Sequence, residues 1–164
     1  TIMGEAFFII PVIFILIISN LGKGVFLMFN TTLATLITAI LKLLFNEGRP
    51  MTYIQDFEIV SEHAFWEIHS SLSFPSGHTT AAFALFISLS LLSKNRILIL
   101  LYIILAIIVG TSRIYLLQHF FVDVFFGALI GSLISLTSFH FFYYNLAPRK
   151  WSEFSVISWM KSKF

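Results

Sequence analysis

Five long runs of apolar residues limit this chain to a fold that crosses a membrane. An α-helix rises about 1.5 Å per residue, so about 20 apolar residues are needed to cross the hydrocarbon core of a bilayer. The five runs approach this length and lie at about 4–20, 22–45, 76–93, 95–111 and 118–141. None shows the two-residue alternation of a barrel strand over a long window. The sequence therefore predicts an all-α integral membrane bundle of about five transmembrane helices.

The composition supports a membrane protein and argues against other classes. Hydrophobic residues make up 58% of the 164 residues and charged residues only 11%, which leaves too little polar cover for a soluble surface. The net charge is only +2 and the basic residues are scattered, so nucleic acid is not an expected partner. The chain has no Cys, which excludes disulfides and thiolate metal sites.

We expect a single transmembrane domain over residues 1–164. Its one long connection, 46–74, mixes acidic and large apolar side chains, which favours a short amphipathic helix at the membrane surface. The tail at 145–164 is basic. The chain begins with Thr1 rather than Met, so we also expect that an upstream segment is missing from the sequence. Nothing in the sequence points to an obligate protein partner.

The charges can be assigned to the two faces of the membrane, because five spans place the chain ends on opposite faces. One face receives the basic tail together with Lys23, Lys94 and Arg96. The other receives the long connection and most of the acidic residues. Cytoplasmic loops carry an excess of Lys and Arg. The basic face is therefore expected in the cytoplasm, and the 46–74 connection outside it.

Three polar clusters interrupt the apolar pattern, and alternation of the spans brings all three to the acidic face. Ionisable side chains in a membrane cost about 2.5–3.5 kcal/mol at a helix centre, so they normally lie at helix ends or in cavities. A shared pocket is the interpretation that we favour. The clusters are Lys42 with Arg49 and Pro50; Pro75, Ser76, Gly77 and His78; and Ser112 and Arg113 followed by His119 and Asp123.

Several residues of the three clusters are suited to bind an anion such as phosphate. Lys42 and Arg49 are seven residues apart, which places both on one face of a helix that ends before Pro50. Ser76 and Gly77 follow Pro75 as a helix start, where free N–H groups and the helix dipole attract an anion. Arg113 offers a planar fork for two phosphate oxygens.

The two histidines have the spacing of a nucleophile and an acid. His119 and Asp123 are four residues apart at the start of a helix, so the carboxylate can hold one ring nitrogen protonated and leave the other free to attack. His78, on a different helix, is the candidate general acid for the leaving oxygen. Taken singly, each residue is more simply explained as an interfacial anchor or a satisfied polar group. Their convergence on one face is poorly explained in that way.

Together these residues resemble the three-part signature of the type 2 phosphatidic acid phosphatase (PAP2) family. Every signature residue is present at the family spacing over 42–123. The resemblance implies a core shared with haloperoxidases, a phosphohistidine intermediate on His119, and neither a metal nor another cofactor. It implies acid catalysis by His78, polarisation of His119 by Asp123, and phosphate binding by Lys42, Arg49, Ser76, Gly77 and Arg113. Membrane members usually have six helices, so the first is expected to be absent from this sequence.

The function expected from this resemblance is hydrolysis of a lipid phosphate in the bacterial inner membrane, at a site on the extracytoplasmic side. Candidate substrates are undecaprenyl diphosphate, phosphatidylglycerol phosphate, phosphatidic acid and a lipid A phosphate. An alternative from a different class is a carrier or binding protein that only holds lipid headgroups. Relatives that oxidise halides with vanadate resemble soluble proteins, and the membrane spans argue against that activity.

A metal site in the long connection is a weaker alternative. Pairs four residues apart, such as Glu58 with Glu62 and His63 with Glu67, can share a helix face, and His69 follows them. Exposed acidic residues are common on a surface helix, so we favour a solvated face and expect no metal.

Overall fold

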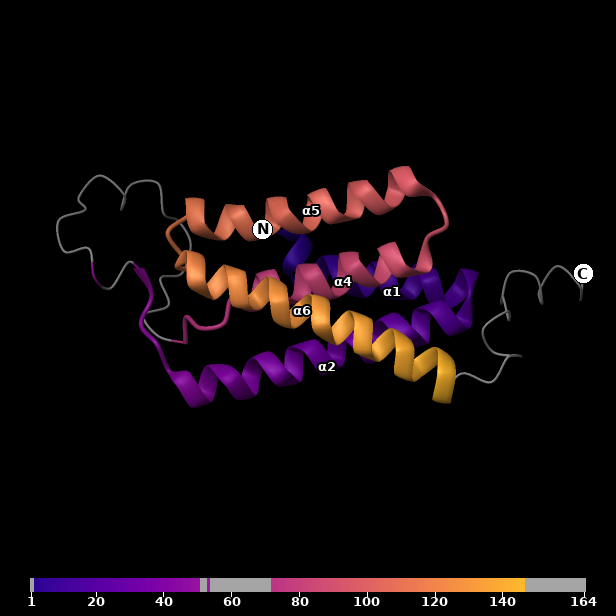
Figure 1. Cartoon of the computed structure of the whole chain (residues 1–164), viewed down its shortest axis with the longest axis horizontal. Helices are drawn as coiled ribbons and strands as arrows, with labels where there is room; N and C mark the ends of the chain where they lie inside the picture. The colour runs from indigo at the N-terminus through magenta and orange to yellow at the C-terminus, as the bar shows by residue number, and fades with distance from the viewer. Residues whose placement is uncertain (1, 51–52, 54–71, 147–164) are drawn as a thin grey trace, which may run out of the picture.

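The fold is a bundle of helices that pack side by side (Figure 1). The structure is a computed structural model, which describes residues 2–50, 53 and 72–146. The described residues contain helices and no strand, which confirms the predicted all-α class. A short 3₁₀ turn, η1, precedes the first helix, and a π-helical turn, η3, follows the last one. The elements are η1 (Ile2–Gly4), α1 (Ala6–Ser19), α2 (Leu21–Phe45), α4 (Gly77–Leu92), α5 (Arg96–Tyr115), α6 (Phe121–Phe141) and η3 (Phe142–Leu146).

Three of the described helices are long and apolar enough to cross a membrane. They are α2, α5 and α6, the last counted with the turn that follows it to Asn145. Helices α1 and α4 are apolar but have only 14 and 16 residues, which is shorter than the sequence predicted. Extended backbone at Asn20 ends α1, and the Asn20 side chain then caps α2 by accepting a hydrogen bond from the Lys23 N–H at 3.0 Å. Helix α4 begins at Gly77, directly after an irregular segment at 72–76.

Helix α4 is the centre of the bundle and packs against α2, α5 and α6. Two glycines of α6 allow a close approach: a Cβ on Gly127 would lie 2.9 Å from the Ser76 carbonyl oxygen, and one on Gly131 only 2.5 Å from that of Thr80. Small residues four apart let helix backbones approach closely in membranes. The beginnings of α4 and α6 are therefore held next to each other.

A buried polar cluster joins three helices in the apolar interior. The Asn30 amide of α2 donates hydrogen bonds to the Ala84 carbonyl at 3.0 Å and the Ser88 hydroxyl at 2.8 Å, both on α4. It also approaches Ser135 Oγ of α6 at 3.3 Å. Hydrogen bonds between helices stabilise association where lipid offers no competing partner.

The segment before α4 is held between two helices. The Phe74 ring packs edge-on against Phe45 of α2 and Phe126 of α6, with ring centres 4.9 and 5.4 Å apart. The Ser73 N–H also donates to the Glu47 carbonyl at 2.9 Å. These contacts bring residues 73–78 to the end of the bundle where α2 ends and α6 begins. Most of the 46–74 connection, with its expected surface helix, and nearly all of the 145–164 tail lie outside the described residues.

Candidate active site

The three predicted clusters meet at one end of the bundle. Lys42 lies in the last turn of α2, His78 in the first turn of α4, Arg113 in the last turn of α5, and His119 just before α6. A cavity of about 770 Å³ opens among them. Five of the eight predicted site residues line this cavity: Lys42, Arg49, Gly77, His78 and His119.

The candidate nucleophile, His119, is oriented by Asp123. His119 is only 2% exposed, and its Nδ1 lies 3.4 Å from Asp123 Oδ2. The same carboxylate oxygen accepts a hydrogen bond from the Phe120 N–H at 3.0 Å. With Nδ1 turned towards the carboxylate, Nε2 is the ring nitrogen that is left for attack.

The position of His119 differs in one detail from the sequence prediction. Helix α6 begins at Phe121, so His119 precedes the helix and does not lie on its first turn. The backbone reaches this position through Leu117, which has a left-handed conformation with φ 54°. Strained conformations of this kind cluster at functional sites. The helical four-residue spacing is therefore not what brings His119 to Asp123.

Ser73 is a site residue that the sequence analysis missed. Its hydroxyl is fully buried and donates a 2.5 Å hydrogen bond to Asp123 Oδ2, and its Oγ lies 3.3 Å from His119 Nδ1. Three groups thus converge on one carboxylate oxygen and hold its charge and direction. The only sequence signal was a polar residue close before the Pro75–His78 motif.

The start of α4 is tied directly to the start of α6. The Ser76 N–H donates to the Asp123 carbonyl at 3.1 Å, and the Ser76 hydroxyl accepts from Thr79 Oγ1 at 2.9 Å. Ser76 is therefore buried behind the site and does not line the cavity. Gly77 lies at the surface of the cavity, where a Cβ would be 3.5 Å from Lys42 Cε.

Lys42 and Arg49 both reach the cavity, although one helix does not hold them. The prediction of a continuous helix up to Pro50 was wrong, because Asn46 adopts a left-handed conformation (φ 44°) and ends α2 after Phe45. Arg49 then returns to the cavity from an irregular segment. Lys42 Nζ donates a hydrogen bond to the carbonyl of Leu72, another residue with positive φ.

Arg113 is a buried cation that does not line this cavity, although its charge acts on Lys42 and His78, which do. The predicted apolar run ended at 111, before Arg113, whereas α5 continues to Tyr115 and contains it. Its side chain is only 3% exposed, and its Nε and Nη1 have no hydrogen-bond partner within the described part of the chain. A buried guanidinium normally has an anionic or polar partner, so these nitrogens are suited to the oxygens of a phosphate.

Glu5 is a second residue that the sequence analysis missed. It precedes α1 and lines the cavity, with Oε1 3.5 Å from His78 Nε2. The signal was present, since Glu5 is the only charged residue in the apolar run 4–20 and such residues are functional candidates. No group of three possible metal-binding side chains occurs among the described residues. The alternative metal site at Glu58–His69 lies outside them.

Comparison with known proteins identifies the family of this chain. The family model described as the PAP2 superfamily matches residues 23–147, which is most of the chain and contains all eight predicted site residues. The chain belongs to the PAP2 superfamily.

Relatives of this PAP2 chain include phosphatases of known structure. The crystal structure of LpxE from Aquifex aeolicus is 30% identical, with 84% of this chain and 79% of that chain covered and a TM-score of 0.71. A PAP2-type phosphatidylglycerolphosphate phosphatase from Bacillus subtilis is 25% identical, with 90% and 75% covered and a TM-score of 0.69. A lipid A 1-phosphatase from Rhizobium johnstonii is 30% identical over 78% of this chain and 53% of its own length. The chain spans 26–54% of the length of four curated relatives.

Burial determines the protonation state of His119 in this PAP2 site. Removal from water lowers the pKa of His119 below its ordinary value, while the hydrogen bond to Asp123 acts in the opposite direction. Desolvation is the larger effect, so the neutral ring predominates at pH 7. A neutral imidazole with Nδ1 held by a carboxylate is the form that can attack.

We predict that His119 titrates below about pH 6.5, the ordinary midpoint of the side chain. In Asp123→Asn the midpoint should fall further, because a carboxylate that favours the imidazolium is removed. Nitrogen NMR of labelled histidine in detergent micelles measures both midpoints, with His119→Gln to assign the signal.

Ser138→Ala is the matched control for this titration. Ser138 is also buried on α6, and its hydroxyl has no hydrogen-bond partner in the described ranges. The control should titrate like the unaltered protein. A midpoint above 6.5 would contradict desolvation as the dominant effect, and a rise in Asp123→Asn would contradict the effect assigned to the Asp123 carboxylate.

Proposed function

We propose that this chain forms the catalytic unit of a phosphatase that removes phosphate from a membrane lipid through a phosphohistidine, without a metal. The observation that supports this most directly is the pair of His119 and Asp123 at the end of a cationic cavity. A nucleophile whose Nδ1 faces a carboxylate, beside cations for phosphate oxygens, is the arrangement that histidine-dependent phosphoryl transfer needs.

The first step transfers the phosphoryl group to the enzyme. His119 Nε2 attacks the phosphorus while the bond to the leaving oxygen breaks, and His78 gives a proton to that oxygen. Asp123 stabilises the charge that develops on the His119 ring. Because the transition state spreads negative charge over the equatorial oxygens, Lys42, Arg49 and Arg113 together with the first N–H groups of α4 supply most of the stabilisation.

The second step releases inorganic phosphate. His78, now neutral, takes a proton from a water molecule, and the resulting hydroxide attacks the phosphorus. The bond between phosphorus and His119 Nε2 breaks, and the electron pair returns to the ring. Both histidines are then in their starting protonation states.

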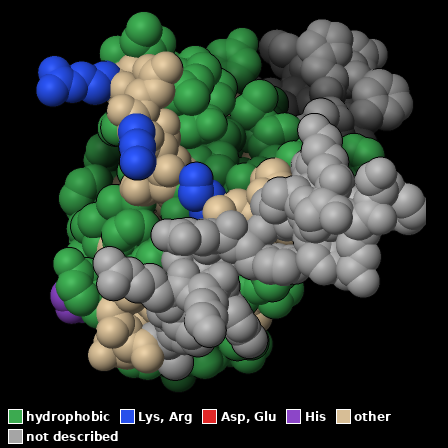
Figure 2. Space-filling view, turned by 90° about the vertical axis from the view of Figure 1, so that its right-hand side faces the viewer, with side chains coloured by type: hydrophobic (Ala, Val, Ile, Leu, Met, Phe, Trp, Pro, Cys, Tyr) green, Lys and Arg blue, Asp and Glu red, His purple; other side chains and the backbone are tan. Residues whose placement is uncertain are grey.

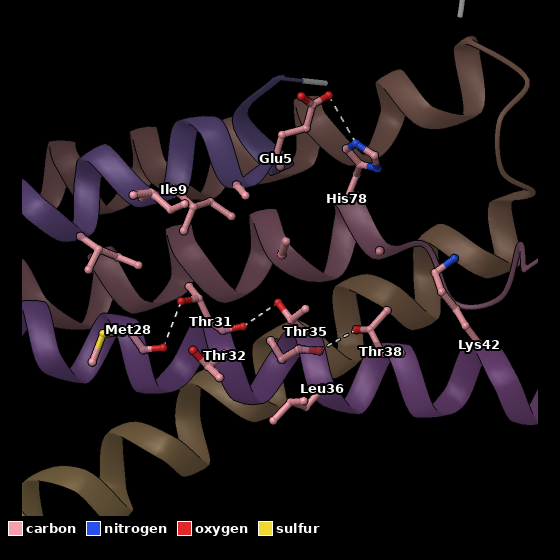
Figure 3. A pocket seen from close by; sticks show the side chains of 18 of the residues that line it. Glu5, Ile9, Met28, Thr31, Thr32, Thr35, Leu36, Thr38, Lys42 and His78 are labelled. Carbon is pink, nitrogen blue, oxygen red and sulfur yellow. Dashed lines mark hydrogen bonds and ion pairs between the residues drawn. The ribbon is translucent and has the colours of Figure 1, made fainter. Parts of the chain in front are cut away.

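An apolar groove supports a lipid as the substrate. The cavity continues from the charged end between α1 and α2, where Figure 3 shows Ile9 on one side and Met28 and Leu36 on the other. Thr31, Thr35 and Thr38 of α2 also line it, and each donates its hydroxyl to a carbonyl of its own helix at 2.7–2.9 Å. These threonines therefore need no polar partner in the groove. A lipid fits this cavity if its headgroup lies at the cationic end and its alkyl chain lies along the apolar groove.

A carrier that only holds lipid headgroups explains less of the site. Cations and helix N–H groups are sufficient to bind a phosphate. Binding alone needs neither a buried imidazole with one nitrogen paired to a carboxylate nor a second histidine beside it. These two features favour an enzyme that hydrolyses its lipid substrate over a carrier that only binds it.

The distribution of charge supports a site on the extracytoplasmic side of a bacterial inner membrane. The end of the bundle opposite the site includes Lys23, Lys94 and Arg96, at the start of α2 and the α4–α5 connection. Figure 2 shows that end, with basic side chains and no acidic one among the described residues in view. A basic end of this kind normally faces the cytoplasm.

The function is tested by phosphate release from purified protein in detergent with EDTA present. The panel consists of undecaprenyl diphosphate, phosphatidylglycerol phosphate, phosphatidic acid and a lipid A phosphate. We expect release from at least one lipid and its loss in His119→Ala, because His119 is the proposed nucleophile that forms the phosphoryl–enzyme bond. Equal release by His119→Ala would contradict the mechanism, and binding without release would favour the carrier. Inhibition by EDTA that a divalent ion reverses would contradict metal independence.

The groove is tested by filling it. Thr35→Trp should raise KM for a long-chain lipid phosphate about tenfold, since losing contact with about two methylene groups at about 0.8 kcal/mol each has this effect. Hydrolysis of p-nitrophenyl phosphate, which has no alkyl chain, should be unchanged. Ile40→Trp is the control, because Ile40 is an exposed residue of α2 outside the groove. Equal effects of the two variants on the lipid would exclude this groove as the chain site.

The orientation is tested by labelling, which the absence of Cys simplifies. A single Cys introduced as Glu47→Cys, at an exposed position near the site, should react with a membrane-impermeant maleimide in intact spheroplasts. Lys94→Cys at the other end should react only after the membrane is permeabilised. The reverse pattern of labelling would place the site in the cytoplasm.

A further inference from the structure

The acid, His78, has a carboxylate partner of its own. Glu5 Oε1 lies 3.5 Å from His78 Nε2, and the two side chains point towards each other in Figure 3. Both side chains are partly exposed, at 46% and 31%, so the pair lies at the open part of the cavity. Among the described residues that line this cavity, Glu5 is the only carboxylate.

The backbone around Glu5 is built to hold it there. Gly4 packs on the start of α4 so closely that a Cβ would lie 2.6 Å from the His78 carbonyl oxygen. Glu5 occupies the N-cap position of α1, yet its side chain makes no capping hydrogen bond. The carboxylate is turned to His78 and not to the exposed N–H groups of its own helix. The close packing of Gly4 on the His78 backbone therefore keeps the two residues near each other.

The charges around His78 explain why an acid at this position needs a carboxylate. Arg113 of α5, His119 before α6 and Glu5 before α1 are the charged or titratable groups that act on His78. Burial is the largest effect on the ring and opposes its protonation. Arg113 also opposes protonation by repulsion, as does His119 when it is charged. Of the three groups, only Glu5 favours the imidazolium that a general acid requires.

We propose that Glu5 is a positioning residue that holds Nε2 of His78 and favours the protonated ring, which donates from Nδ1. The proposal rests on the proposed phosphatase function. In the first step, the Nδ1 proton of the imidazolium moves to the leaving oxygen as the bond from that oxygen to phosphorus breaks. The Nε2 proton stays directed at Glu5. In the second step, water returns a proton to Nδ1, and no further reactant is needed.

The test is the pH dependence of kcat/KM for the Glu5→Gln variant of the full chain. It is measured with a lipid phosphate that has an alkoxide leaving group and with p-nitrophenyl phosphate. The basic limb of kcat/KM for the lipid should move about one pH unit lower, because a carboxylate that favours the charged ring is removed. At pH values on the basic limb, the rate for the lipid should be about tenfold lower than that of the unaltered protein. The nitrophenolate leaves without an acid, so its rate should change little. The acidic limb, which reports His119, should not move.

Three further variants make the result specific. Glu47→Gln removes an exposed carboxylate near the site and should behave like the unaltered protein, since only the Glu47 backbone carbonyl contacts Ser73. Glu5→Asp should recover part of the lost activity. In the background of His78→Ala, Glu5→Gln should have no further effect, because the acid through which it acts is gone.

The outcomes separate this proposal from the function on which it rests. An unmoved basic limb, or equal losses of activity with both substrates, would overturn the role of Glu5. If His119→Ala at the same time releases no phosphate, the phosphatase assignment remains intact. Release that survives in His119→Ala would overturn the phosphatase mechanism and this proposal with it.

Discussion

The close approach of α4 to α6 is the contact on which the site depends. Gly127 and Gly131 leave room for the backbone of α4, and the Ser76 N–H bonds directly to the Asp123 carbonyl. The proposed acid, His78, and the helix start that is proposed to bind the anion belong to α4, while the carboxylate that faces His119 belongs to α6. A Cβ at Gly127 would press on the Ser76 carbonyl and change the distance between these groups. Two residues without side chains thus set the geometry of the polar ones.

The site also depends on how an apolar bundle accommodates polar groups. Within the helices, hydroxyls of Thr31 and Thr38 bond to their own backbone, and Asn30 bonds across three helices. The charged residues of the candidate site lie at one end, where a cavity opens. There the cations lie beside a helix N-terminus, and all of them attract the same kind of ligand. This arrangement places an anionic headgroup at the end of the bundle and leaves the remainder of the cavity to an apolar chain.

The sequence predicted the identity of most site residues but not the local structure that holds them. Lys42, Arg49, Gly77, His78 and His119 were expected in one pocket, and all five line it. The reasons given for two of them were incomplete. Arg49 does not continue the helix of Lys42, because Asn46 ends that helix, and His119 precedes α6 instead of opening it. Turn conformations such as the positive φ at Leu117 leave no periodic pattern in a sequence, so these boundaries were not predictable from spacing.

Of the side chains that contact the two histidines, only Asp123 was predicted from the sequence. Asp123 is four residues from His119, so local spacing was enough to suggest their contact. Ser73 is 46 residues from His119, and Glu5 is 73 residues from His78. Both meet their partners only because separate helices pack at the same end of the bundle. Long-range contacts of this kind depend on packing between elements, and a single sequence contains no periodic signal for them.

The sequence by itself determined that this chain is a helical membrane protein and that its polar residues gather at one end. Hydrophobic run length and the cost of charge in lipid decide both points without reference to any contact. The tertiary structure alone decided that Glu5 faces His78, where the helices end, and that a groove leads from the cations into the apolar region. These features arise from side chains brought together across α1, α2, α4 and α6, and the physical reason is that packing, not periodicity, fixes distances between helices.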